Sequence, residues 1–123
     1  MANELILIVE DNPKNLKLVR DTLQVKGYQT LEAETGEEGV RLAHERQPAL
    51  ILMDIQLPGI TGVEALQRLR ADPATQHTPV VAVTASVMPQ DQTRIMAGFN
   101  DFQGKPISVR ELLATVREIL DKP

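Results

Sequence analysis

The sequence predicts an α/β fold in which helices cover both faces of a single doubly wound, five-stranded parallel sheet with the order 2-1-3-4-5. Short apolar runs alternate with segments of helical periodicity along the chain, which is typical of repeated βα units. The runs at residues 5–9, 49–53 and 79–85 are almost continuously apolar, as strands covered on both faces should be. The length of 123 residues suits one domain over residues 1–123, without a linker or low-complexity tract.

The first βα unit has clear boundaries. Its strand is the run LILIV at residues 5–9, and its helix is expected over residues 13–26. Asn12 before Pro13 is a favoured helix start, and Gly27 is a favoured helix end. The apolar residues of the inward face recur at helical spacing, and they are Leu16, Val19 and Leu23.

The remaining units follow the same pattern. Further strands are expected at 28–33, 49–53, 79–85 and 100–104, the last being the least apolar. Helices are expected between these strands, at 37–46, 62–71 and 89–97. Ser108 and Glu111 form a capping-box pattern that begins a last helix. That helix is expected to bury four apolar residues, Leu112, Val116, Ile119 and Leu120.

Acidic residues stand where two of the apolar strands end. Glu10 and Asp11 follow the first strand, and Asp54 ends the third. In an open α/β sheet the ligand site lies outside the carboxyl ends of the strands, where the strand order reverses. In the predicted order that point lies between the first and third strands, so the three carboxylates converge and repel one another. Mg²⁺ would resolve this repulsion, because it prefers carboxylate, water and phosphate oxygens.

Two further polar groups belong to the same edge of the sheet. Thr84 ends the fourth strand, and Lys105 follows the fifth. A hydroxyl donor and an ammonium group beside three acids can bind a phosphoryl group, whose transfer depends mainly on positioning and electrostatics. Asp54 is the predicted nucleophile, which becomes phosphorylated. Pro58 and Gly59 would turn the chain away and leave the crevice open.

The composition argues against several other classes of function. Lys and Arg are scattered singly, the formal net charge is −4 and aromatic residues make up 2% of the chain, so we expect no direct nucleic-acid binding. The glycines form neither a GxGxxG motif nor a P-loop. His44 and His77 lack metal-ligand spacing and are expected at the surface. Without cysteine, a signal peptide or an apolar run of ~20 residues, the chain is expected to be a cytoplasmic domain without membrane contact.

Four motifs together resemble the receiver domain of two-component response regulators. They are LIVEDN (7–12), LILMDIQLPGITG (50–62), PVVAVTA (79–85) and GKPIS (104–108). The resemblance covers essentially the whole chain and is strongest to stand-alone DivK-type receivers. It implies the CheY-like, flavodoxin-like form of the predicted fold. The simplest interpretation is a complete stand-alone receiver.

The resemblance also implies a role for each site residue. Asp54 would accept a phosphoryl group from a phosphohistidine on a histidine kinase or a phosphotransfer protein. Lys105 would pair with the phosphoryl oxygens, and its bond to Pro106 is expected to be cis, which only proline makes inexpensive. The implied Mg²⁺ ligands are the side chains of Glu10, Asp11 and Asp54 and the backbone carbonyl of Gln56.

Two residues are implied to act as a switch. Thr84 would move toward the phosphoryl group and Phe102 would swing inward, which repacks the face of the fourth helix, fifth strand and fifth helix where a downstream protein effector binds. Phe102 stands where many receivers have Tyr and lacks the hydroxyl, while Phe99 is expected in the core. Glu10 stands where many receivers have Asp and would reach the metal through water. The expected oligomeric state is a monomer or a weak phosphorylation-dependent dimer.

Three functions from different classes are compatible with these residues. The leading one is a signalling switch, which is no enzyme beyond self-catalysed phosphoryl acceptance and autodephosphorylation. A haloacid-dehalogenase-type phosphatase is a second, but Gln56 stands where its D-x-D pattern needs Asp, and a cap domain does not fit. The third is a phosphorylation-independent docking pseudo-receiver, although the chain keeps the whole acid, Thr and Lys set. Asp54 as a mere turn cap is disfavoured by that same set.

Overall fold

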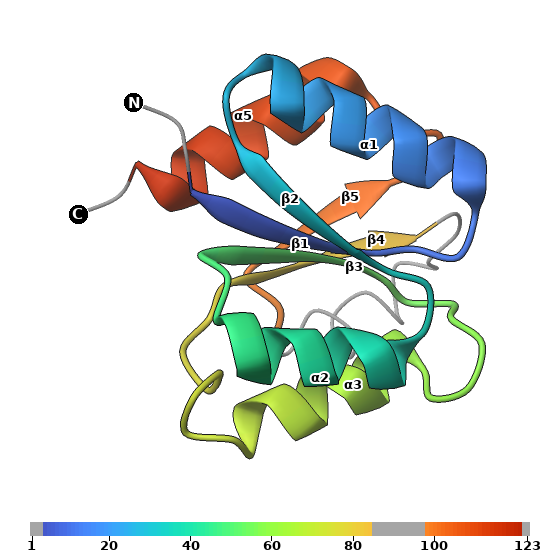
Figure 1. Cartoon of the computed structure of the whole chain (residues 1–123). Coiled ribbons are helices and arrows are strands. Elements are labelled where there is room, and N and C mark those ends of the chain that lie inside the picture. Colours follow the sequence, from blue (N-terminus) through green and yellow to red (C-terminus); the bar gives the residue numbers. More distant parts are fainter. Residues whose placement is uncertain (1–3, 85–97, 122–123) are drawn as a thin grey trace.

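The computed structural model describes residues 4–84 and 98–121, which form one layered α/β unit (Figure 1). The helix expected at 89–97 lies outside the described residues. In chain order the elements are β1 (Leu5–Val9), α1 (Pro13–Val25), β2 (Gln29–Ala33), α2 (Gly36–Arg46), β3 (Leu50–Asp54), α3 (Gly62–Arg70), β4 (Val80–Thr84), β5 (Asp101–Gly104) and α5 (Val109–Leu120).

All five strands run parallel in the order β2-β1-β3-β4-β5, which confirms the predicted sheet. In Figure 1 α1 and α5 lie on one face of this sheet, and α2 and α3 lie on the other. The chain moves outward from β1 to β2 in one direction and from β3 to β5 in the other. The strand order therefore reverses between β1 and β3, as the sequence pattern indicates.

The apolar strands contribute side chains to two hydrophobic cores, one on each face of the sheet, because successive side chains of a strand point to opposite faces. Leu7 and Val9 belong to the cluster on the α2 and α3 side, whereas Ile6 and Ile8 belong to the cluster on the α1 and α5 side. All four side chains are buried. This explains why the strand sequences lack the polar alternation of a one-sided sheet.

The helices bury most of the residues that their periodicity indicates. Leu16, Val19 and Leu23 of α1 and Leu112 and Val116 of α5 are buried. Two residues expected in the core, Ile119 and Leu120, are only partly buried, because they lie in the last turn of α5. Phe99 is buried as predicted, and Phe102 is half-buried against the cluster on the α2 and α3 side.

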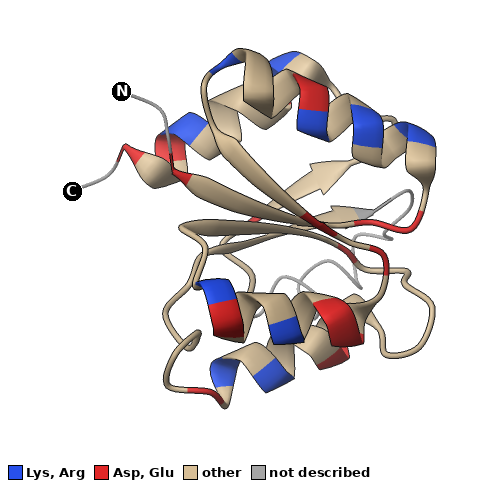
Figure 2. Cartoon of the chain, in the orientation of Figure 1, with Lys and Arg blue, Asp and Glu red and all other residues tan. Residues whose placement is uncertain are grey.

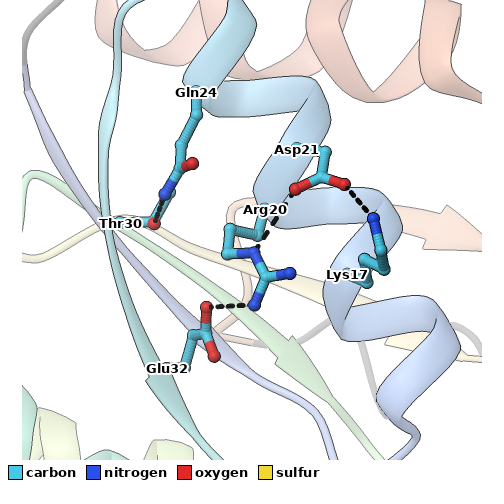
Figure 3. A network of polar contacts seen from close by, with 6 residues as sticks. All are labelled: Lys17, Arg20, Asp21, Gln24, Thr30 and Glu32. Atoms are coloured by element: carbon cyan, nitrogen blue, oxygen red, sulfur yellow. Dashed lines mark hydrogen bonds and ion pairs between the residues drawn. The ribbon is translucent and has the colours of Figure 1, made fainter.

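The outermost strand β2 is polar on one of its faces. Leu31 and Ala33 pack into the cluster on the α2 and α3 side, whereas Thr30 and Glu32 meet polar residues of α1. Figure 3 shows Arg20 between Asp21 and Glu32, with the Arg20 side chain donating to Glu32 over 3.1 Å. Polar pairing of this kind suits an edge strand, which the helix covers only partly.

Lys, Arg, Asp and Glu are spread along the helices, with both signs interspersed, and further acids stand at strand ends (Figure 2). Residues Lys17 and Arg41 each form an ion pair with the acid four positions later, Asp21 and Glu45. Among the described helices none combines the length and the apolar character that crossing a membrane requires.

Candidate metal and phosphoryl site

Three carboxylates meet at the carboxyl ends of β1 and β3. Glu10 directly follows β1 and Asp54 is the last residue of β3, and the two side chains are buried, with 3% and 4% of their residue surface exposed. Asp11 is exposed beside them. One carboxylate oxygen from each of the three residues lies within 4.8 Å of the others. The neighbouring positions of β1 and β3 in the sheet create this cluster.

Lys105 lies between the two buried acids. Its Nζ is 3.0 Å from Oε1 of Glu10 and 3.0 Å from Oδ2 of Asp54. Lys105 is the first residue after β5, and its peptide bond to Pro106 is cis. Lys105 therefore reaches the two acids even though it follows β5, the edge strand, which is separated from β3 by β4.

Backbone amides complete the contacts of the buried carboxylates. The Gln56 N–H donates to Oδ1 of Asp54 over 3.0 Å, and the Asn12 N–H donates to Oε2 of Glu10 over 3.2 Å. Each of the four carboxylate oxygens thus faces one donor. Asn12 also caps α1, because its Oδ1 accepts from the Lys14 N–H over 2.9 Å. The start of α1 is in this way tied to the site.

The electrostatics of the site favour an added cation. Burial, followed by the neighbouring Asp54, raises the pKa of Glu10, although Lys105 and the Asn12 amide oppose this. Burial lowers the pKa of Lys105, but its contacts with Asp54 and Glu10 outweigh this and raise it. Lys105 is thus held in its charged form, but its single positive charge does not balance the three carboxylates of the cluster. An all-oxygen ligand set with excess negative charge fits Mg²⁺.

The loop after β3 depends on a close approach at Gly62, a residue that motif reasoning did not single out. A Cβ at Gly62 would lie 2.6 Å from the carbonyl oxygen of Asp54, so only glycine allows α3 to begin there. The Gly62 N–H donates to the Ile55 oxygen over 2.9 Å and closes the loop. Its place at the start of α3, after Pro58 and Gly59, is the sequence signal that could have identified it.

The switch residues predicted from the sequence lie on the last two strands. The main chain of Thr84 ends β4 and is paired with Gly104 of β5, at the same edge of the sheet as Asp54 and Lys105. Phe102 lies in β5, two residues before Gly104. Neither of the predicted surface histidines is near the site. His44 and His77 are exposed, and His44 pairs with Asp72 over 2.6 Å at the opposite end of α2.

Comparison with known proteins finds one family over nearly all of the chain. The family model of the response regulator receiver domain matches residues 6–117. The chain is similar to the polar-differentiation response regulator DivK of Brucella ovis, with 44% identity over 116 residues, which is 94% of each chain. DivK of Brucella melitensis shows the same identity and coverage.

Solved structures show the same architecture. The chain is similar to the receiver domain of a sensor histidine kinase from Pseudomonas aeruginosa, with a TM-score of 0.91, 32% identity and coverage of 98% of this chain and 100% of that one. That structure has a magnesium ion coordinated in its active site cleft. The chemotaxis response regulator CheY4 of Vibrio cholerae matches with a TM-score of 0.90 and 26% identity, over 97% of this chain and 100% of that one.

Proposed function

Because the chain belongs to the response regulator receiver domain family, we propose that it accepts a phosphoryl group on Asp54 from a phosphohistidine of a partner protein. Members of this family are signalling domains of two-component systems, which act with a phosphodonor kinase and an effector. For this chain we propose a histidine kinase or a histidine phosphotransfer protein as the donor. The receiver domain would span residues 1–123.

One observation carries this proposal. The Asp54 carboxylate lies buried at the switch point of the sheet, with the Lys105 ammonium 3.0 Å from one of its oxygens and two further acids beside it. A carboxylate used only to cap a turn needs neither the cation nor the additional acids. The arrangement places a nucleophile, a positive charge and metal ligands together, as phosphoryl transfer requires.

The proposed transfer forms one bond and breaks one bond. A carboxylate oxygen of Asp54 attacks phosphorus, and the P–N bond of the donor phosphohistidine breaks. The leaving imidazole nitrogen takes a proton from water, and the product on this chain is an aspartyl phosphate. Lys105 would pair with the phosphoryl oxygens, because their negative charge replaces the charge that the Asp54 carboxylate loses on phosphorylation. Hydrolysis of the same acyl phosphate would reset the domain.

The residues present fit Mg²⁺ as the cofactor. Its ligands would be Glu10, Asp11, Asp54 and the backbone carbonyl of Gln56, with Glu10 acting through water. When bound, the ion supplies positive charge that offsets the charge of the phosphoryl oxygens. A magnesium ion in the cleft of the Pseudomonas aeruginosa receiver supports this assignment.

The proposed output is a change of the face formed by the helix expected at 89–97, β5 and α5. Thr84 would donate a hydrogen bond to the phosphoryl group, and Phe102 would move further into the core. Phe102 is only half-buried against the cluster on the α2 and α3 side, so its exposed fraction can still decrease. A downstream protein would bind the altered face, with the chain as a monomer or a weak phosphorylation-dependent dimer.

The direct test uses acetyl phosphate as a small phosphodonor. Wild type, Asp54→Asn and Asp72→Asn are incubated with and without Mg²⁺, and the intact mass is recorded. Asp72→Asn is the matched control, because it makes the same chemical change at the opposite end of the sheet. We expect wild type and Asp72→Asn to gain the mass of one phosphoryl group only with Mg²⁺, and Asp54→Asn to gain none.

The other outcomes point to the competing functions. A folded wild-type protein that gains no mass would support a docking pseudo-receiver. Steady release of phosphate from phosphomonoesters over many turnovers, with no adduct captured, would support a phosphatase.

A further inference from the structure

The loop between β3 and α3, residues 55–61, is contacted from outside by the first turn of α2. A Cβ at Gly59 would lie 2.5 Å and 2.6 Å from the two carboxylate oxygens of Glu37, so this carboxylate rests directly against the Gly59 backbone. The Ile60 N–H also points to Oε1 of Glu37, at a long 3.5 Å. Gly59 has a φ of +78°, so a side chain there would add backbone strain to the clash.

A second contact holds the same part of the loop. A Cβ at Gly36 would lie 2.7 Å from Cγ1 of Ile60, and the Ile60 side chain packs against the cluster on the α2 and α3 side. Consecutive residues of α2, Gly36 and Glu37, therefore hold the tip of the loop. Glu37 stands in the first turn of α2, where the helix dipole favours a carboxylate.

The other end of the loop is fixed to the phosphoacceptor strand. Gly62 packs against the Asp54 carbonyl and donates to Ile55, while the Gln56 N–H donates to the Asp54 carboxylate over 3.0 Å. Gln56 thus lies between two anchored points, β3 on one side and the tip held by α2 on the other. A loosened tip would change the position of the Gln56 backbone, whose N–H donates to Asp54 and whose carbonyl oxygen is the implied metal ligand.

We propose that Glu37 is a positioning residue of the site, which acts through the loop tip on the backbone of Gln56. This inference rests on the proposed function of Asp54 and Mg²⁺. Glu37 is not among the implied metal ligands, and its carboxylate oxygen Oε1 accepts from the Ile60 N–H. Replacing it by a residue without an acceptor should loosen the loop and weaken metal binding.

The experiment compares Glu37→Ala with Glu37→Gln. The two variants lose the same charge, but only Gln keeps an oxygen that can accept from the Ile60 amide. Glu38→Ala and Glu38→Gln are the matched controls, because Glu38 is exposed in the same helical turn and has the same charge. Amide hydrogen exchange at Ile60 and Gln56 is measured without metal, and the dissociation constant for Mg²⁺ is measured by NMR titration.

We expect Glu37→Ala to speed exchange at both amides and to weaken Mg²⁺ binding by about threefold relative to Glu37→Gln, as loss of one weak hydrogen bond implies. The Glu38 pair should show no such difference, and the thermal midpoints of the Glu37 pair should differ by only a few degrees, as loss of one weak hydrogen bond implies. Equal values for Glu37→Ala and Glu37→Gln would overturn the inference. So would faster exchange at Ile60 alone, because the contact would then be merely structural.

Failure of the proposed function is seen separately. If wild type binds no Mg²⁺, the assignment of the metal site fails, whereas the Gln56 exchange rate still tests the role of Glu37 without any metal. An unchanged Gln56 rate in Glu37→Ala then overturns the inference, and a faster rate supports it.

Discussion

Lys105 is the residue on which the charge balance of the site depends. Its ammonium contacts both buried acids at 3.0 Å, and these contacts raise its pKa despite the opposing effect of burial. Motif reasoning assigns Lys105 to phosphoryl oxygens but could not show that it bridges Glu10 and Asp54. That bridge depends on how far the chain after β5 reaches across the sheet, which local sequence does not encode.

Replacing Lys105 by Met should therefore destabilise the protein. Two buried carboxylates would lose their cation, and partial exposure of the site should hold the loss of unfolding free energy to about 2 kcal/mol. Urea unfolding at neutral pH without Mg²⁺ measures this. Lys17→Met, which removes an exposed pair with Asp21, should cost about 0.5 kcal/mol or less. Equal losses in the two variants would contradict the bridging role.

Glu10 should give the stability a distinct pH dependence. Its pKa is raised above the ordinary 4.5, so between that value and the raised pKa the folded protein binds more protons than the unfolded chain. The contribution of Glu10 to the unfolding free energy therefore falls as pH rises through this window. Urea unfolding across the window in EDTA should show a less negative slope for Glu10→Gln than for wild type. An identical slope would refute the raised pKa.

The side chain of Arg70, the last residue of α3, forms hydrogen bonds with two loops. Its Nη1 donates to the carbonyl oxygens of Thr75 and Thr78, at 3.2 Å and 2.8 Å, and its Nη2 donates to Gly98 and Asn100 at 3.2 Å each. The segments before β4 and before β5 are thereby joined to α3. The sequence predicts a helix at 62–71, close to the observed α3, because apolar residues recur there at helical spacing. The acceptors of Arg70 could not be predicted in the same way, since they lie up to thirty positions away along the chain.

Arg70→Lys should lower the unfolding free energy by about 1–2 kcal/mol. An ammonium group keeps the charge but cannot reproduce the fork of donors, so several carbonyl groups lose their partner. Chemical denaturation measures the loss. Arg68→Lys, in an exposed pair with Glu64 one turn away, should change stability by about 0.5 kcal/mol or less. If both variants unfold alike, the bridging contacts contribute nothing.

The topology of the molecule explains why its fold and site could be predicted together. Continuous apolar runs such as residues 50–53 of β3 need covering on both faces, and repeated βα units then place the carboxyl end of every strand at one edge of the sheet. Glu10, Asp11 and Asp54 meet there because of the strand order alone. The contact of Glu37 with Gly59 was not predictable, because it depends on how closely α2 and the loop after β3 approach.

Metal binding should be visible in the stability of the whole chain. A ligand that binds only the folded protein raises the unfolding free energy, by roughly 2.7 kcal/mol at a hundredfold excess over its dissociation constant. We expect Mg²⁺ to raise the thermal midpoint of wild type and to have a much smaller effect on Asp11→Asn. Asp11→Asn removes one of three neighbouring negative charges, so its metal-free midpoint should equal or exceed that of wild type. Equal Mg²⁺ effects on both proteins would place the ion elsewhere.

The central claim is that Asp54 carries the phosphoryl group, and chemical trapping tests it most directly. Borohydride reduces an aspartyl phosphate to homoserine, and peptide mass spectrometry then locates the altered residue. After treatment with acetyl phosphate and Mg²⁺, we predict homoserine at position 54, no homoserine at Asp11 and no hydroxynorvaline, the product that a glutamyl phosphate would give, at Glu10. Homoserine elsewhere, or a phosphorylated protein without homoserine, would contradict the account.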